Sequence, residues 1–305
     1  MANLKLRVLT LFVNLSIRSI EYSMTILQTG GWDDYELLDS GEGYRLERFG
    51  KFTIAKPDPQ AIWKRRLDMS AWNSVDAEYI KDGWIRHRDV PESWLLTYKN
   101  ISFHARLTPF KHAGVFPEQH LHWDFITETI VQSKRDIKVL NLFGYTGLAS
   151  LVAAAAGASV THVDASKPAI TWARENQAAS KLEDKPIRWI LDDAIKFVER
   201  EVRRGNTYDG IIMDPPVYGH GPTGEIWDFP KSFPQLINLS SRILSNNPLF
   251  VIANAYAISA SALMLKNVME DSLRVGQIKV GELALEERTG ERLLSTGIFA
   301  RWSAE

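Results

Sequence analysis

The chain has 305 residues, of which 45% are hydrophobic and 24% are charged, and its formal net charge is −1. This composition is typical of a globular protein with a sizeable core, built as one large domain or two modest ones. The chain has no cysteine, which excludes disulfides, thiolate zinc sites and a cysteine nucleophile, and its near-zero charge provides no general attraction to nucleic acid or membranes. A cysteine-free chain fits the reducing cytoplasm, where we expect the protein to be located.

The first residues form an apolar run, Leu4–Ile20, that is interrupted by charged and polar side chains. The run is too short and too broken to span a bilayer, and no small-residue cleavage site of a signal peptide follows it. We therefore expect residues 1–24 to be an N-terminal extension that is disordered or results from a misassigned start. Met24 is the alternative start, and an intact mass equal to that of the full chain would contradict it.

Residues 25–111 are predicted to form a small β-rich domain. Tyr44–Phe49 alternates with a period of two, turn residues flank it at 41–43 and 56–59, and Trp94–Tyr98 is a further strand-like run. The segment contains thirteen basic and thirteen acidic residues, so it has no surplus of positive charge for binding phosphates. Lys64-Arg65-Arg66 is its best basic patch, for which we favour a solvated surface over a nucleic-acid contact.

From Asp136 onward, short apolar runs alternate with helical patterns. This alternation predicts an α/β fold with a parallel sheet covered by helices on both faces, and a third part of the chain at 112–305. Gly281–Glu286 and Ser295–Trp302 predict a closing antiparallel hairpin. We expect strands over 137–143, 160–164, 187–191, 211–214 and 250–254, and helices over 147–156, 168–179, 194–204, 233–244 and 259–269.

The first candidate site element is the segment Asn141-Leu142-Phe143-Gly144-Tyr145-Thr146-Gly147, a strand that passes through a glycine turn into a helix. Gly144 and Gly147 lack the Cβ that would keep a ligand away from the backbone. Ligands of open α/β sheets bind beyond the carboxyl ends of the strands, where a helix N-terminus favours a carboxylate. Asp164 ends the next strand, where a carboxylate can accept both hydroxyls of a ribose, and Ser166 is expected to cap the helix that follows.

The third and fourth elements follow the next two strands. One carboxylate of Asp192-Asp193 can accept from the amine of an adenine, and we favour Asp193 because Asp192 can cap the next helix. In Asp214-Pro215-Pro216 the prolines fix an extended turn without backbone donors, so free carbonyls can face the site, and Tyr218 can stack on a planar substrate. A rigid loop without chemistry is the alternative. A dehydrogenase would need G-x-G-x-x-G, and the spacing here provides only Gly144 and Gly147.

These motifs resemble those of the bacterial class I S-adenosyl-L-methionine (SAM)-dependent methyltransferases related to the 23S ribosomal RNA cytosine-C5 methyltransferase family. The likeness includes Ala113–Gln119, similar to that family's F-x-D-Q-R segment, and extends roughly from Trp32 to the end of the chain. It implies a Rossmann-like, seven-stranded methyltransferase sheet with SAM as cofactor; no metal is expected. The candidate catalytic residues are Asp214, Pro215 and Tyr218. The candidate cofactor-binding residues are Phe116, Gln119, Asn141, Phe143, Gly144, Tyr145, Thr146, Gly147, Asp164, Ala165, Asn176, Asp192, Asp193 and Asp214.

Two departures leave the methyl acceptor open. Glu118 and His120 replace the family's aspartate and arginine, and the cysteine thiolate with which such enzymes activate cytosine C5 is missing. An amine acceptor remains possible because Asp214 and the Pro215 carbonyl could accept from an NH₂ group, although Val217 separates the prolines from Tyr218. By family analogy we favour RNA as the substrate. The alternatives are a small-molecule or protein acceptor, and a SAM-binding protein without catalysis. No membrane partner is expected, and the oligomeric state is open.

Three further features carry weaker hypotheses. His120-Leu121-His122-Trp123-Asp124 contains potential metal ligands, but on a helix this spacing spreads them over more than one face. His220 could line the acceptor pocket, within a loop at 219–224 that could close over a substrate. Trp227 is equally suited to stack on a base or to pack in the core.

Overall fold

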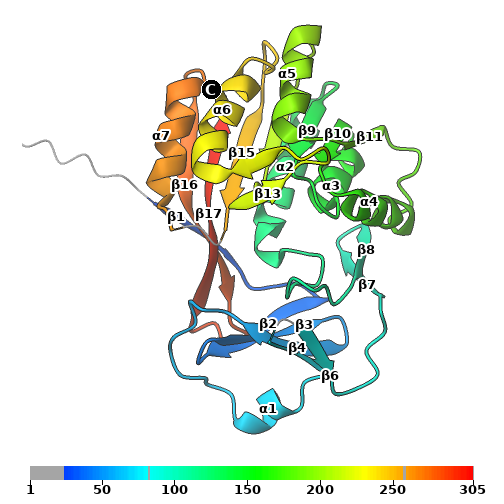
Figure 1. Cartoon of the computed structure of the whole chain (residues 1–305), viewed down its shortest axis with the longest axis vertical. Helices are drawn as coiled ribbons and strands as arrows, with labels where there is room; N and C mark the ends of the chain where they lie inside the picture. The colour runs from blue at the N-terminus through cyan, green and yellow to red at the C-terminus, as the bar shows by residue number, and fades with distance from the viewer. Residues whose placement is uncertain (1–23, 82, 257–258, 305) are drawn as a thin grey trace, which may run out of the picture.

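The computed structural model describes residues 24–81, 83–256 and 259–304, so the extension expected at 1–24 lies, except for Met24, outside the described residues. A large sheet with its helices forms the upper part of Figure 1, and a smaller sheet forms the lower part. Within the described ranges, no helix is long and apolar enough to cross a membrane.

The large sheet has the strand order β1-β16-β17-β15-β12-β9-β10-β11. Only β17 runs antiparallel to its neighbours, so the expected hairpin closes an otherwise parallel sheet. The seven expected strands are present, and β1 adds an eighth at the edge, parallel to β16. Their bounds are β1 (Thr25–Thr29), β9 (Lys138–Leu142), β10 (Ser159–Asp164), β11 (Ile187–Leu191), β12 (Gly210–Met213), β15 (Phe250–Ala255), β16 (Gln277–Glu286) and β17 (Leu293–Ser303).

Helices cover both faces of this sheet, as the alternating pattern predicted. Phe197, Phe233 and Leu265 belong to one buried cluster on the face of α5, α6 and α7, and Ile126 and Ala153 belong to another on the face of α2 and α3. The helices are α2 (His120–Ser133), α3 (Leu148–Ala155), α4 (Lys167–Ala179), α5 (Ala194–Arg204), α6 (Phe229–Ser241) and α7 (Ala262–Ser272). Helix α6 begins four residues earlier than expected, because Pro230 fits its first turn.

The smaller sheet forms what we call the N-terminal lobe, residues 35–86. Its strand order is β2-β3-β4-β5-β6. The bounds are β2 (Tyr35–Gly41), β3 (Tyr44–Phe49), β4 (Phe52–Pro57), β5 (Ala77–Ile80) and β6 (Gly83–Arg86), with the short helix α1 (Met69–Asn73) between β4 and β5.

The expectation of one β-rich domain over 25–111 therefore needs correction. Strand β1 lies in the large sheet, and an ideal Cβ on Gly281 would come within 1.6 Å of the Thr25 carbonyl oxygen, so a glycine is required there. The hairpin of β7 (Trp94–Tyr98) and β8 (Ile101–Ala105) is a separate two-stranded sheet. It packs on α4, where Trp172 Nε1 donates to the His104 carbonyl at 3.0 Å.

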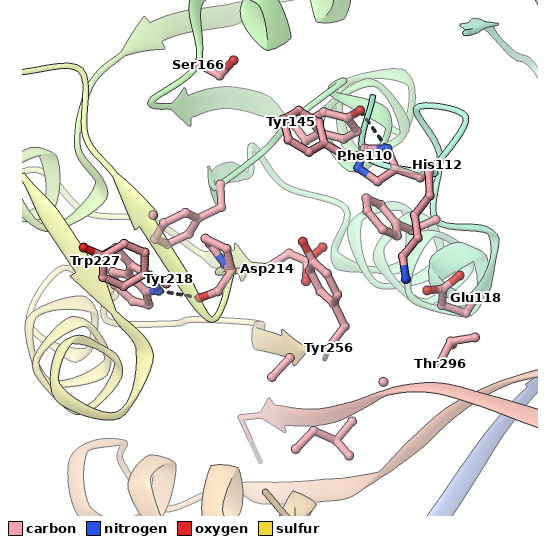
Figure 2. A pocket seen from close by; sticks show the side chains of 18 of the residues that line it. Phe110, His112, Glu118, Tyr145, Ser166, Asp214, Tyr218, Trp227, Tyr256 and Thr296 are labelled. Atoms are coloured by element: carbon pink, nitrogen blue, oxygen red, sulfur yellow. Dashed lines mark hydrogen bonds between the residues drawn. The ribbon is translucent and has the colours of Figure 1, made fainter. Parts of the chain in front are cut away.

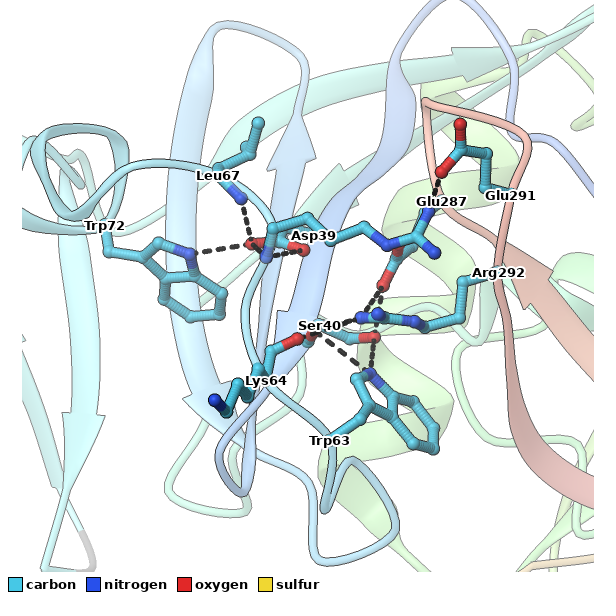
Figure 3. A network of polar contacts seen from close by, with 10 residues as sticks. Asp39, Ser40, Trp63, Lys64, Leu67, Trp72, Glu287, Glu291 and Arg292 are labelled. Carbon is cyan, nitrogen blue, oxygen red and sulfur yellow. Dashed lines mark hydrogen bonds and ion pairs between the residues drawn. The ribbon is translucent and has the colours of Figure 1, made fainter.

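A polar network fixes the N-terminal lobe to the tip of the β16–β17 hairpin (Figure 3). Ser40 Oγ donates to Glu287 Oε1 at 2.5 Å, and Arg292 Nη1 donates to the Ser40 carbonyl at 3.1 Å. In the basic patch, the Arg65 guanidinium lies 3.9 Å from the centre of the Trp72 ring, and Arg66 pairs with Glu291. Arg65 and Arg66 thus interact with other residues of the chain, which supports the interpretation of this patch as a solvated surface.

Candidate active site

The candidate residues gather around a chamber of about 1220 Å³ that begins at the carboxyl ends of the parallel strands and reaches the N-terminal lobe. Nine of the candidates line it: Phe116, Phe143, Tyr145, Asp164, Ala165, Asp192, Asp193, Asp214 and Tyr218. A further four, Gln119, Asn141, Gly144 and Thr146, line a small cavity of about 40 Å³ that shares Phe116, Phe143, Tyr145 and Asp214 with the chamber. Since single-ligand pockets usually occupy about 300–1,000 Å³, the chamber has room for a cofactor and part of a second molecule.

Gly147, Asn176 and Pro215 line neither cavity. Asn176 is fully buried, with its amide donating to the Thr146 carbonyl at 2.9 Å and accepting from the His104 N–H at 2.8 Å. Asn176 therefore supports the glycine turn from behind. Its signal in the sequence, proximity to the motif, could not distinguish this support from cofactor contact.

The turn after β9 is shaped by left-handed backbone conformations. Phe143, Tyr145 and Gly147 have φ values of 55°, 48° and 84°. An ideal Cβ on Gly144 would lie 2.3 Å from the His162 ring, so Gly144 permits close packing on the neighbouring strand β10. The described contacts therefore require a glycine here for packing within the chain, and not for the approach of a ligand.

Asp164 at the end of β10 holds the turn in place. Its Oδ2 accepts from the Tyr145 N–H at 2.8 Å, and its Oδ1 accepts from the Ser166 N–H at 2.8 Å. Each carboxylate oxygen retains a further lone pair, available to donors in the chamber. Burial raises the pKa of Asp164, and the two backbone hydrogen bonds oppose that rise. Ser166 caps α4 as expected, accepting from the Ala169 N–H at 3.3 Å.

The two acids after β11 have roles opposite to the expected capping assignment. Asp193 is the cap of α5, with its Oδ1 accepting from the Lys196 N–H at 2.9 Å. Asp192 accepts from the Asp193 N–H at 2.9 Å and pairs with Arg200. The prediction that Asp192 caps the helix was wrong. Asp193 still suits the adenine role, because one of its oxygens makes no hydrogen bond within the described part of the chain.

Asp193→Ser separates helix capping from the proposed adenine contact, because serine can cap α5 without offering a carboxylate. We expect binding of S-adenosylhomocysteine (SAH) to weaken about 10-fold, the effect of losing one hydrogen bond to a charged group, with little change in melting temperature. Asp192→Asn is the matched control and should bind SAH nearly as well as the wild type. Calorimetry measures both, and a larger loss in Asp192→Asn would transfer the adenine role to Asp192.

Asp214 after β12 is the group best placed for proton transfer. Its Oδ2 accepts from Gln119 Nε2 at 2.6 Å, and its Oδ1 has no partner in the described chain. Burial raises the pKa of Asp214 to about 7; the Gln119 hydrogen bond opposes the rise, and the charge of Glu118 adds to it. A carboxyl with a pKa near neutrality can exchange a proton at physiological pH.

The expected free proline carbonyls need correction, because the Pro216 carbonyl accepts from Trp227 Nε1 at 2.6 Å. Trp227 is buried, with its ring 4.8 Å from that of Phe143, so it packs in the core and fixes the turn. The expectation of a loop over 219–224 needs correction, because residues 219 and 220 belong to the strand β13 (Tyr218–His220). Residues 221–225 connect β13 to the strand β14 (Ile226–Asp228). His220 lines the chamber, and its ring packs edge-on against that of Tyr218.

Several chamber residues are absent from the sequence-based candidates. Tyr256 follows β15, so the rule that ligands bind at the carboxyl ends of strands could have found it. Its ring lies 5.5 Å from that of Phe116, and burial raises its pKa to about 12. Figure 2 shows Glu118, His112 and Thr296 around the same cavity as Tyr256 and Asp214. Arg45 and Lys56 of the N-terminal lobe also line it, and no local pattern in the sequence indicates this.

Both histidines of α2 contact other residues of the chain. His120 contacts Thr29 and lies 3.1 Å from the Tyr98 hydroxyl. His122 is buried with its ring 5.3 Å from that of Phe299, and Asp124 accepts from the Tyr98 hydroxyl at 2.6 Å. Among the described residues, no group of three or more histidines and acids could hold a metal ion.

Comparison with known proteins connects this geometry to a family. Residues 124–225 match the family model "Conserved hypothetical protein 95". The crystal structure of a SAM-dependent methyltransferase from Agrobacterium tumefaciens is 42% identical, with a TM-score of 0.91 over 93% of this chain and 95% of that one. A putative SAM-dependent methyltransferase from Streptococcus mutans is 21% identical, with a TM-score of 0.67 over 88% and 75% of the two chains, and shares the fold.

Curated relatives are larger proteins. The ribosomal RNA large subunit methyltransferase K/L of Shewanella sp. (strain MR-4) is 30% identical over 215 residues, which cover 64% of this chain and 30% of the relative. That of Pseudoalteromonas atlantica is 31% identical over 223 residues, with 65% and 30% covered. The chain thus spans about 30% of the length of these relatives.

Proposed function

Because the chain belongs to the SAM-dependent methyltransferases, we propose that it transfers a methyl group to a base of RNA. The observation that carries this proposal is the continuous chamber, which extends from Asp164 past Asp214 to the N-terminal lobe. We call the part at Asp164, Asp192 and Asp193 the cofactor half, and the part beyond Asp214 the acceptor half.

The residues of the cofactor half fit SAM. Asp164 would accept from the ribose hydroxyls and Asp193 from the adenine amine. The rings of Phe143 and Tyr145 offer faces to a sulfonium cation, and the N-terminus of α3 suits a carboxylate. When bound, SAM supplies an electrophilic methyl carbon on a positively charged sulfur.

The acceptor half suits a planar ring. Tyr218 and Phe110 line the chamber with exposed fractions of 57% and 74%, and Tyr256, which is partly buried, also lines it. Aromatic side chains with free faces bind bases of single-stranded RNA by stacking. Asp214 would accept a hydrogen bond from the reacting group and take its proton as the methyl group is transferred. The fixed positions of Gln119 and the proline turn would hold that carboxylate in place.

RNA is supported as the acceptor by the names of the curated relatives, which act on ribosomal RNA of the large subunit. An RNA substrate of the ribosome would place the protein in the cytoplasm. The missing cysteine makes a thiolate-assisted attack by cytosine C5 unavailable, so a nitrogen atom suits the carboxylate at Asp214 better.

Labelled methyl transfer tests this function. The enzyme and radiolabelled SAM are incubated in parallel with total RNA, with a protein-free metabolite extract and with total cell protein. We expect label in the RNA and accumulation of SAH, with neither in the absence of enzyme. Label only in metabolites would exclude RNA as the acceptor, and SAH binding without methyl transfer to RNA, metabolites or total protein would indicate a protein that only binds the cofactor.

A further inference from the structure

The acceptor half ends at a buried pair of opposite charges that the methyl-transfer chemistry does not use. Lys56 comes from β4 of the N-terminal lobe, and Glu118 comes from the short 3₁₀ helix Pro117–Gln119 that precedes α2. Both line the chamber, and they are only 2% and 6% exposed. Glu118 directly precedes Gln119, the residue that holds Asp214. Glu118 interacts electrostatically with both Asp214 and Lys56, so the pair lies close to the candidate proton acceptor.

Each of these two side chains retains hydrogen-bonding capacity. Glu118 Oε2 is buried and has no hydrogen-bond partner, and Glu118 forms no ion pair within 4.0 Å in the described ranges. The Lys56 ammonium contacts Glu47 Oε2 at 2.7 Å, which leaves two of its three N–H donors. Buried polar groups without partners are costly, so a purely structural pair would be expected to bond directly.

Further charged residues of the N-terminal lobe surround Lys56. Glu47 accepts from the Tyr35 hydroxyl at 2.8 Å, and Arg45 approaches Glu47 and Asp58 at 3.4 and 3.7 Å. The positive charges of Arg45 and Lys56 balance the negative charges of Glu47 and Asp58. A free anion therefore gains little here, whereas a neutral group that donates to Glu118 and accepts from Lys56 would complete both.

We infer that Glu118 and Lys56 form a specificity pair that binds the hydrogen-bonding edge of the acceptor base, with Glu118 accepting from an N–H and Lys56 donating to the neighbouring acceptor atom. The inference rests on the proposed function, because an RNA base is a planar ring that carries such an N–H beside a carbonyl or ring nitrogen. The aromatic walls would hold the faces of the ring, and this pair would fix its rotation toward Asp214.

Glu118→Gln and Lys56→Met test the pair, because each keeps the approximate shape of the side chain. We expect the KM for RNA to rise at least 10-fold in either variant, while the dissociation constant of SAH stays within about twofold of the wild-type value. Glu201→Gln is the matched control, since Glu201 is a buried carboxylate of α5 whose partners are Arg204, Asn206 and Tyr208. It should lower the melting temperature without changing the KM.

A second measurement needs no turnover. Binding of the four nucleoside 5′-monophosphates to the SAH complex is followed by saturation-transfer NMR, and we expect the wild type to bind at least one that Glu118→Gln does not bind. If the wild type binds a nucleotide that Glu118→Gln does not bind, but methylates no RNA, RNA is excluded as the substrate and the role of the specificity pair is supported. If the wild type methylates RNA but both variants keep its KM and nucleotide binding, the inferred role of the specificity pair is wrong and the proposed function is supported. A wild type that neither binds a nucleotide nor methylates RNA overturns both.

Discussion

Asp164→Ala is expected to weaken SAH binding by at least about 100-fold. A hydrogen bond to a charged group contributes about 1.5–3 kcal/mol, and Asp164 would accept from both ribose hydroxyls. Its oxygens also hold the Tyr145 and Ser166 N–H groups, so the variant loses the shape of the glycine turn as well. Isothermal calorimetry with SAH measures the loss, and thermal melting in the absence of ligand shows whether the variant is folded.

Ser166→Ala separates these contributions. It removes the cap of α4, at an expected cost of about 1 kcal/mol in stability, and it leaves the Asp164 carboxylate in place. We expect SAH to bind this variant nearly as tightly as the wild type. Undiminished SAH binding by folded Asp164→Ala would contradict the assignment of the cofactor half.

The fold was predictable where the determining pattern is local. The apolar runs and helical periods after Asp136 gave the bounds of β11 and α5 correctly, and the motif positions placed most of the candidate residues on one chamber. The sheet positions of β1 and of the β7–β8 hairpin were not predictable in this way. Their short alternating patterns resemble those of the N-terminal lobe, and only long-range pairing with β16 and packing on α4 separate them.

Several residues assigned to the acceptor half were not among the sequence-based candidates, for a related reason. Lys56 and Arg45 lie on strands with ordinary alternation, and they reach the chamber only because the network at Ser40 and Glu287 fixes the lobe to the β16–β17 hairpin. Glu118 attracted attention only as a departure from the family's aspartate. A buried carboxyl and a buried ammonium cannot be distinguished from surface charges by sequence alone, because burial is a property of the assembled lobes.

Asp214→Asn is expected to lower kcat by at least about 100-fold, since a positioned proton acceptor contributes about 10²- to 10⁴-fold. The amide can still interact with Gln119, so SAH binding should change little. In the wild type, kcat should rise with pH and level off above about 7, because burial raises the pKa of Asp214 to about 7 and only the ionised carboxylate accepts a proton. The residual activity of the variant should lack this rise. A wild-type profile that stays flat between about pH 5.5 and 8, on both sides of this pKa, would contradict the role of Asp214.

Protein stability should respond in the opposite direction. The pKa of Asp214 is about 7 in the folded protein and ordinarily 3.8, so the folded state binds more protons than the unfolded state between these values. The contribution of Asp214 to stability is therefore present below the ordinary pKa and is lost as the pH rises through 7. Above pH 7, Asp214→Asn should melt at a higher temperature than the wild type, and near pH 4 the two should melt alike. An inactive variant that is more stable at the working pH would show that the buried charge at Asp214 is retained for chemistry rather than for folding.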